Sequence, residues 1–136
     1  MADDDAATPD EVAADETPEA APETELVHGA PVVTTRGQRV LHPSREQVVD
    51  VVRALRDDGY VICIDVTGVD YLAHPQSDLP EGVRPERFEV VVQLLSHRDR
   101  DRLRLRVQVP EDDPVLPSLF EVHPGTEAME REVFDM

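Results

Sequence analysis

The feature of this sequence that most constrains its fold is the strict alternation of residue type from Leu103 to Val109. Apolar side chains occupy the odd positions of this segment, and Arg104, Arg106 and Gln108 occupy the even ones. A period of two is typical of a β-strand with one buried and one exposed face. The apolar segment Phe88–Leu95 precedes it across a short polar connection, so the two segments predict an antiparallel hairpin.

A helix is predicted over Ser44–Asp58. Apolar residues recur there at helical spacing and define one buried face: Val48, Val51, Val52 and Leu55. Ser44 and Gln47 have the spacing of a capping box. Gly59 follows the last turn, where a residue with left-handed backbone geometry commonly ends a helix.

A strand is predicted directly after this helix, in the β-branched segment Tyr60–Val66. A regular strand would place four residues on one face, namely Tyr60, Ile62, Ile64 and Val66. The single cysteine, Cys63, has no sequence neighbour suited to a disulfide or a catalytic pair and is predicted to be a small buried apolar residue. Segment Ala73–Glu86 holds three of the twelve prolines and is predicted to be an exposed loop.

The last predicted element is a helical stretch in which Met129, Val133 and Met136 form one stripe. The order of elements is therefore helix, strand, long loop, hairpin and helix. This order lacks the regular strand–helix alternation of a doubly wound sheet. We therefore predict an α+β fold: a two-layer α/β sandwich with a mixed or mostly antiparallel sheet and helices on one face.

Negative charge is concentrated at the N-terminus. Residues 1–27 contain ten acidic residues and no Lys or Arg, a charge of -10 out of the total of -17. So few large apolar side chains cannot offset the entropy of ordering the backbone, and a disordered acidic tail is predicted over residues 1–27. A docking tail for a basic partner is the alternative. One folded domain is predicted over residues 28–136, beginning between His28 and His42.

Composition excludes several classes of protein. A chain with 30 Asp and Glu against 13 Lys and Arg repels the phosphates of nucleic acid over most of its surface. No apolar run reaches the roughly 20 residues that a membrane helix needs. The first five residues, with three aspartates, lack the basic start of a signal peptide. We therefore expect a cytoplasmic protein that does not span a membrane.

No self-sufficient active site is predicted. The five histidines are dispersed, and no metal-ligand spacing occurs. The six glycines form neither a P-loop nor a dinucleotide fingerprint. On a helix, Glu130 and Glu132 point roughly 200° apart and cannot act as a facing acid–base pair. We expect no catalytic, cofactor-binding or metal-binding residue in this chain.

Residues 97–106 carry five arginines and two aspartates, a local charge of +3. A patch for anions or nucleic acid is one interpretation. The interleaved aspartates and the absence of nearby aromatic residues favour an exposed polar face that prevents a strand from self-pairing. A third interpretation is that Arg102, Arg104 and Arg106 contact an acidic neighbouring subunit.

Five segments carry a resemblance: Gly68–Leu72, Phe88–Ser96, Arg102–Val107, Pro117–Leu119 and Met129–Met136. In this order and spacing they resemble the 30-kDa subunit, also called the C subunit, of the respiratory NADH:quinone oxidoreductase (complex I). The most specific segment is Glu130-Arg131-Glu132-Val133-Phe134-Asp135-Met136, which is similar to the family's Glu-Arg-Glu-x-aromatic-Asp-x signature. At two positions where the family usually has aromatic residues, this chain has His123 and Ala128.

The resemblance implies a non-catalytic building block in the peripheral arm of a proton-translocating oxidoreductase, on the cytoplasmic side of the bacterial plasma membrane. It implies no cofactor in this chain, since FMN, iron–sulfur clusters, NADH and quinone would be bound by other parts of the complex. The expected partners are neighbouring subunits, especially the D subunit, which helps to form the quinone pocket, and also the B and I subunits. The implied interface consists of signature residues: Glu130, Arg131, Glu132, Phe134 and Asp135.

Three other functions remain open from the sequence: an accessory subunit of a related membrane hydrogenase or F420H2 dehydrogenase complex, a freestanding interaction module, and an independent hydrolase. The family continues beyond the signature with Phe-Gly and a Gly-His-Pro-Asp-Leu-Arg segment, whereas this sequence stops at Met136. We therefore expect the domain over residues 28–136 to be C-terminally incomplete and not to assemble stably as it stands.

Overall fold

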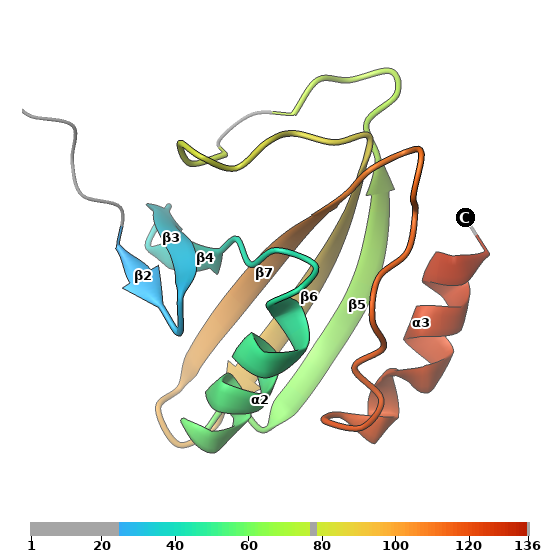
Figure 1. The fold of residues 1–136 in the computed structure, drawn as a ribbon. Helices are drawn as coiled ribbons and strands as arrows, with labels where there is room; N and C mark the ends of the chain where they lie inside the picture. The colour runs from blue at the N-terminus through green and yellow to red at the C-terminus, as the bar shows by residue number, and fades with distance from the viewer. Residues whose placement is uncertain (1–24, 77–78, 136) are drawn as a thin grey trace, which may run out of the picture.

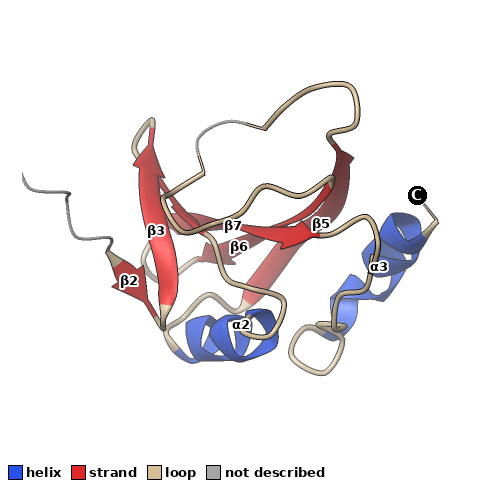
Figure 2. Ribbon diagram, turned by 45° about the horizontal axis from the view of Figure 1, so that its top comes forward, coloured by secondary structure: helices blue, strands red, loops and turns tan. Residues whose placement is uncertain are grey.

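The computed structural model describes residues 25–76 and 79–135 (Figure 1). Its elements are, in order, β2 (Leu26–Val27), β3 (Ala30–Thr35), β4 (Gln38–Leu41), α2 (Val48–Asp57), β5 (Ile62–Asp70), β6 (Phe88–Ser96), β7 (Asp101–Val109), the 3-10 helix η1 (Pro124–Thr126) and α3 (Glu127–Phe134). The strands form one mixed sheet in the order β2-β3-β4-β7-β6-β5, in which β4 pairs with β7 in parallel and the other neighbours pair antiparallel. Both helices lie on the same side of this sheet (Figure 2), so the predicted α+β sandwich is confirmed.

The predicted hairpin is confirmed. Strands β6 and β7 pair over their whole length, from Phe88 opposite Val109 to Ser96 opposite Asp101. The odd-numbered apolar residues of β7 are at most 4% exposed, as the period of two requires. Together with Val92 and Leu94 of β6, they form the central part of the sheet's contribution to the hydrophobic core.

The helix predicted over Ser44–Asp58 begins later than its N-terminal signal. Helix α2 starts at Val48, but the capping-box contacts are made one turn earlier. The Gln47 backbone N–H donates to Ser44 Oγ (3.2 Å), and the Ser44 N–H donates to Gln47 Oε1 (3.0 Å).

At the C-terminal end of α2, Gly59 has a φ of +116°, and a Cβ there would lie 2.7 Å from the Arg98 guanidinium. The positive φ therefore favours glycine at position 59, since a side chain there would strain the backbone and displace the Arg98 guanidinium.

The strand after α2 is longer and less regular than the sequence predicts. Strand β5 begins at Ile62, and its pairing with β6 shifts between Cys63 and Asp65. This bulge leaves Ile64 42% exposed whereas Val66 is 4% exposed, so the prediction that Ile64 and Val66 share one face of a regular strand is wrong. The physical reason is that one extra residue in a strand shifts the side-chain alternation by one position.

Strands β2, β3 and β4 lie outside the elements predicted from the sequence. Strands β3 and β4 form a hairpin whose two-residue turn, Arg36-Gly37, has positive φ at both positions (53° and 79°). This is the geometry of a type I′ turn. Strand β2 pairs with the start of β3, so the end of the predicted tail over residues 1–27 belongs to the sheet. Residues 1–24 of that tail lie outside the described residues.

The sheet face opposite the helices is partly covered, by the loop between β5 and β6 (Figure 2). Beneath this loop Glu89 of β6 is 2% exposed. Its carboxylate accepts hydrogen bonds from three side chains: Arg106 (2.7 Å), Gln108 (2.7 Å) and the hydroxyl of Tyr71 (3.0 Å). In β7 itself the even-numbered side chains are exposed or intermediate, so the prediction that β7 buries one face only is confirmed, and the buried polar residue of the second face is Glu89 of β6.

The hydrophobic core lies between the sheet and the helices. Helix α2 contributes four residues that are at most 2% exposed: Val48, Val51, Val52 and Leu55. Leu119 and Val122, from the segment between β7 and η1, are buried beside them. In α3 none of the residues is buried, and Met129 and Val133 pack only partly against the core. Met136, the third member of the predicted stripe, lies outside the described residues.

Candidate functional site

Helix α3 carries the signature residues, and Glu130 is the one that binds back onto the domain. Its Oε1 accepts a hydrogen bond from the Ser118 hydroxyl (2.6 Å), and its Oε2 accepts bonds from the Leu119 backbone N–H (2.7 Å) and the Thr126 hydroxyl (3.0 Å). One carboxylate thus fixes α3 to the segment that follows β7. Two separate segments of the resemblance, Pro117–Leu119 and the signature, meet at this carboxylate.

The other four residues of the implied interface are not buried. Arg131 pairs with Glu127 one turn earlier (3.5 Å), a contact that contributes little at this degree of exposure. Phe134 is 86% exposed. Glu132 adds a carboxylate to α3, and Asp135 adds another directly after its last residue. A large aromatic side chain in solvent beside an apolar surface is typical of a contact site for a partner.

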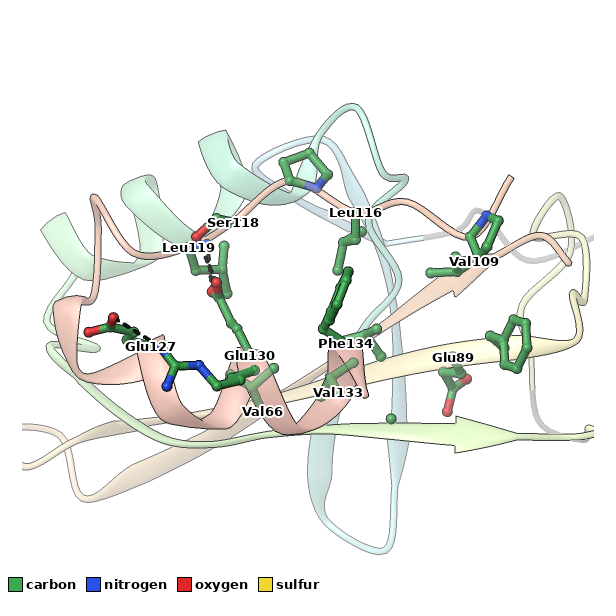
Figure 3. Close-up of a pocket in the computed structure, with 16 residues that line it drawn as sticks. Val66, Glu89, Val109, Leu116, Ser118, Leu119, Glu127, Glu130, Val133 and Phe134 are labelled. Atoms are coloured by element: carbon green, nitrogen blue, oxygen red, sulfur yellow. Dashed lines mark hydrogen bonds and ion pairs between the residues drawn. The ribbon is translucent and has the colours of Figure 1, made fainter. Parts of the chain in front are cut away.

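An open cavity of about 730 Å³ lies beside α3 and is called the α3 groove below (Figure 3). Its walls come from β5, β6, the segment after β7, and α3 itself. Apolar residues from all of these segments line it, among them Val66, Val90, Val109, Leu116, Val133 and Phe134, and the charged side chains of Glu89, Glu127, Glu130 and Arg131 line it as well. A cavity of this size accommodates a small molecule or a few side chains of another protein. The sequence analysis does not single out this groove, because its walls come from segments far apart in the chain.

The stretch of sequence from the end of β7 to the end of α3 is acidic. Residues 110–135 contain eight acidic residues and one basic residue, Arg131, a charge of -7. Residues 97–106, on the hairpin, carry +3. In the folded chain two of the eight acids are paired with arginines from other segments: Asp113 with Arg45 (3.2 Å) and Glu111 with Arg87 (2.6 Å).

The three arginines of β7 predicted as a possible interface differ in their surroundings. Arg102 is exposed, whereas the Arg106 side chain is 15% exposed and forms an ion pair with Glu89 (2.7 Å). The Nε of Arg104 is buried without a hydrogen-bond partner among the described residues. Arg106 therefore stabilises this chain's own fold, and of the three side chains Arg102 is the one exposed for contact with a partner.

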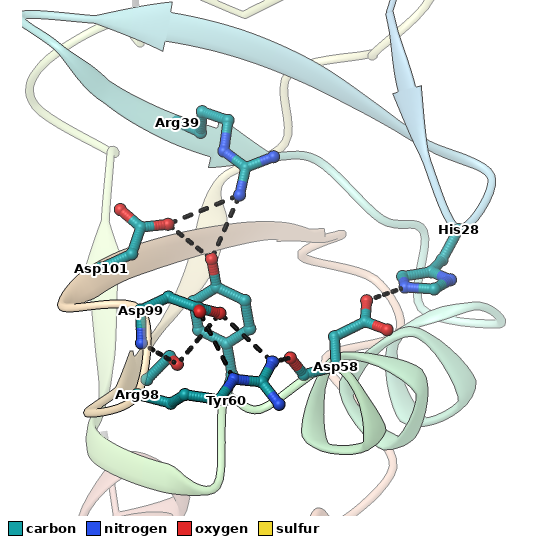
Figure 4. Close-up of polar contacts among 8 residues, drawn as sticks. His28, Arg39, Asp58, Tyr60, Arg98, Asp99 and Asp101 are labelled. Atoms are coloured by element: carbon teal, nitrogen blue, oxygen red, sulfur yellow. Dashed lines mark hydrogen bonds and ion pairs between the residues drawn. The ribbon is translucent and has the colours of Figure 1, made fainter.

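The arginine-rich connection between β6 and β7 makes contacts within the chain (Figure 4). Arg98 donates a hydrogen bond to the Asp58 backbone carbonyl at the C-terminal end of α2, where the helix dipole favours a cation. Asp101 accepts a hydrogen bond from the Tyr60 hydroxyl and lies 3.4 Å from Arg39. Burial, together with the hydrogen bond to Asp101, raises the pKa of Tyr60. These contacts favour a structural role for the connection over an anion-binding patch.

Among the described residues, the possible metal ligands are dispersed and the Cys63 thiol is half-buried. Within residues 25–76 and 79–135, no three His, Cys, Asp or Glu side chains are arranged to hold a metal ion. Burial raises the pKa of the Cys63 thiol to about 11, so the thiol is protonated at neutral pH. Among the helices of the same two ranges, none has the length and apolar character needed to cross a membrane. The feature with the clearest potential for function is the α3 groove.

Comparison with known proteins gives a family relationship. Residues 41–136 match the family described as "Respiratory-chain NADH dehydrogenase, 30 Kd subunit". The chain is 43% identical over 103 residues to the NADH-quinone oxidoreductase C subunit of Sinorhizobium medicae (strain WSM419), a match that covers 74% of this chain and 46% of that relative. It is 44% identical over 104 residues to the C subunit of Roseiflexus castenholzii (strain DSM 13941 / HLO8), with 74% of this chain and 54% of the relative covered. The chain thus spans about half the length of these curated relatives.

Two solved structures resemble the fold. The trypsin-resistant fragment (1-134) of Nqo5 superposes with a TM-score of 0.68 at 33% sequence identity, covering 79% of this chain and 81% of the fragment. The membrane-bound sulfane sulfur reductase, an archaeal respiratory membrane complex, contains a chain that superposes with a TM-score of 0.63 at 17% identity, covering 78% and 58% of the two chains. The second likeness concerns the fold alone.

Proposed function

The chain belongs to the family of 30-kDa subunits of the respiratory-chain NADH dehydrogenase, and we propose that it is a non-catalytic structural subunit of a proton-translocating NADH:quinone oxidoreductase. The observation that carries this proposal is the 43–44% identity to relatives named as the C subunit of NADH-quinone oxidoreductase. In this role the chain holds no cofactor. Electrons pass from NADH to quinone through FMN and iron–sulfur clusters in other subunits.

We further propose that the chain braces the D subunit, which helps to form the quinone pocket, with the B and I subunits as additional neighbours. The α3 groove supports this part of the proposal, because it is an apolar surface that α3 leaves open and that ends at the exposed Phe134. The chain then reaches the membrane only through the complex, on the cytoplasmic side of the plasma membrane.

Co-purification from the chain's own host tests this function. The full chain, carrying an affinity tag, is purified from membranes solubilised in mild detergent, and its bound material is analysed for FMN, for iron–sulfur absorbance and for NADH:quinone reductase activity. We expect all three to accompany the tagged chain in a fixed ratio. A chain that elutes without them, or with a hydrogenase or F420H2 dehydrogenase activity instead, contradicts the proposal.

A further inference from the structure

We propose that the acidic N-terminal segment, residues 1–24, binds back onto an arginine-bearing end of the chain's own sheet. This surface is formed by Arg36, Arg100 and Arg102 and is called the arginine end below. The inference goes beyond the proposed function and does not rest on it. Three observations carry it: the exposed charge of the arginine end, the direction of the chain at Glu25, and the charge of residues 1–24.

The arginine end joins two turns of the sheet. Arg36 lies in the turn between β3 and β4, Arg100 ends the turn between β6 and β7, and Arg102 follows in β7. Because β4 pairs with β7 in parallel, the two turns lie at the same end of the sheet. A contact between Arg39 and Asp101 (3.4 Å) joins the two hairpins there (Figure 4).

The positive charge of the arginine end is exposed. All three side chains are exposed, and none of them forms an ion pair within residues 25–76 and 79–135. The two aspartates of the β6–β7 connection are already paired, Asp99 with Arg98 and Asp101 with Arg39. An acidic segment at this end therefore meets charge that the described part of the chain does not neutralise.

Arg102 faces away from the acids at the end of α2. Its neighbour Leu103 is 0% exposed in the core beneath the helices, so the alternation of β7 places Arg102 on the opposite face of the sheet. Asp57 and Asp58, which end α2, lie on the side of the helices. The sheet itself therefore separates these carboxylates from Arg102.

The chain enters the sheet from the direction of the arginine end. Strand β2 runs antiparallel to β3, and the Val32 backbone N–H donates to the Glu25 carbonyl (2.9 Å). Traced backward from Glu25, the chain therefore leaves along the edge of β3 and toward the turn that holds Arg36. Residues 34 and 35, at the end of β3, are exposed, so this path is open within the described part of the chain.

Residues 1–24 supply the complementary charge. They contain five Asp and four Glu and no Lys or Arg. An exposed ion pair is weak and is screened by salt, but a covalent link raises the effective concentration of the two groups enough for weak contacts to form. We therefore expect several interchanging ion pairs with the arginine end. An acidic segment of a neighbouring subunit has to displace them before it contacts Arg102.

Paramagnetic relaxation in the full chain tests this contact. A nitroxide label is attached at Ala14→Cys in a Cys63→Ser background, and NMR measures the loss of amide intensity in the folded domain. At low salt we expect residues 34–38 and 98–102 to lose at least about half of their intensity and α3 to lose little, and at about 1 M salt we expect both to lose little. Circular dichroism checks that the labelled chain is folded.

Two variants of equal net charge separate the arginine end from a general charge effect. Each changes three exposed arginines to glutamine: Arg36→Gln, Arg100→Gln and Arg102→Gln in one, and Arg53→Gln, Arg84→Gln and Arg131→Gln in the control. We expect the first variant to abolish the local intensity loss and the control to keep it. Equal behaviour of the two variants would overturn the inference.

The distribution of the intensity loss gives two further outcomes. A loss spread evenly over the domain, or centred on α3, would overturn the inference, because residues 1–24 would then not select the arginine end. A sample that mixes labelled chains with unlabelled, ¹⁵N-enriched chains separates contacts within one chain from contacts between two. We expect no loss in the ¹⁵N-enriched chains, and a loss at their arginine end would mean that a second copy is the occupant, which contradicts the inference.

Discussion

The two helices of this domain lie on the same face of the sheet but use it differently (Figure 2). Helix α2 buries four aliphatic residues to 2% exposure or less. Side chains of Ser44 and Arg98 form hydrogen bonds with the backbone just before its first residue and just after its last. Helix α3 buries none, is fixed mainly by one carboxylate, and ends at an exposed phenylalanine. The comparison shows that the apolar residues of α2 are fully buried in the core, whereas those of α3 are only partly buried.

A buried histidine precedes each helix. His42, before α2, is 3% exposed, and His123, before η1 and α3, is 6% exposed. Burial, with a nearby arginine as the smaller cause, lowers the pKa of both: Arg106 acts on His42 and Arg56 acts on His123. The two positions therefore allow the two helices to be probed by pH as well as by substitution.

The largest effect is expected for a charge placed beneath α2. Val52 is 0% exposed, so Val52→Asp should cost about 5 kcal/mol and unfold the domain. Val133→Asp in α3, where the side chain is only partly buried, should cost about 1 kcal/mol and leave the fold intact. Circular dichroism with urea titration measures both. Similar losses of stability in the two variants would mean that α3 is as firmly packed as α2.

A smaller effect is expected from pH. Burial lowers the pKa of His42 from 6.5 to about 4. Between these values the unfolded chain binds a proton that the folded chain does not, so stability should fall as pH falls from 6.5 toward 4 and should level off below that. The loss attributable to His42 is on the order of 3 kcal/mol.

His42→Leu should remove this part of the pH dependence, and urea titrations of the variant and the wild type at several pH values measure the difference. His123→Leu serves as the comparison on the α3 side. A wild-type pH profile that stays parallel to that of His42→Leu from pH 7 to pH 4 would show that folding does not lower the pKa of His42.

The smallest of these effects is expected for the contact that fixes α3. Glu130→Ala removes the acceptor of three hydrogen bonds, including that from the Leu119 backbone N–H, and should cost about 2 kcal/mol. Glu132→Ala, a matched change at an exposed carboxylate two residues away, should stay within about 0.5 kcal/mol. Thermal unfolding of the two variants tests this. Equal melting temperatures would show that α3 is held by other contacts.

Much of the fold can be predicted from local sequence patterns. The alternation in Leu103–Val109 and the helical spacing in Val48–Leu55 predict β7 and α2, because each pattern directly reports which side chains face the core. The Arg36-Gly37 hairpin has the short turn with a glycine that such hairpins require. The strands on either side of this turn, β3 and β4, are short, so the alternation of apolar and polar residues along them is too weak to predict them.

Other features depend on contacts that no local pattern contains. The bulge that exposes Ile64 is set by pairing between β5 and β6. The burial of Glu89 requires Tyr71, Arg106 and Gln108 to meet beneath a loop. For the candidate site, the signature predicts the helix and its exposed residues. The sequence does not predict the α3 groove, because the groove forms only where the segment after β7 packs beside α3 in the folded chain (Figure 3).

Hydrogen exchange of the two helices tests the central claim, that α3 and its groove form the surface through which this chain joins a larger complex. Backbone amides of α2 and α3 are compared in the free chain and in the chain purified with the oxidoreductase. The account predicts that exchange in α3 slows about tenfold or more on association while exchange in α2 does not change. Unchanged exchange in α3, with new protection in the hairpin around Arg102 or along β5, would contradict it.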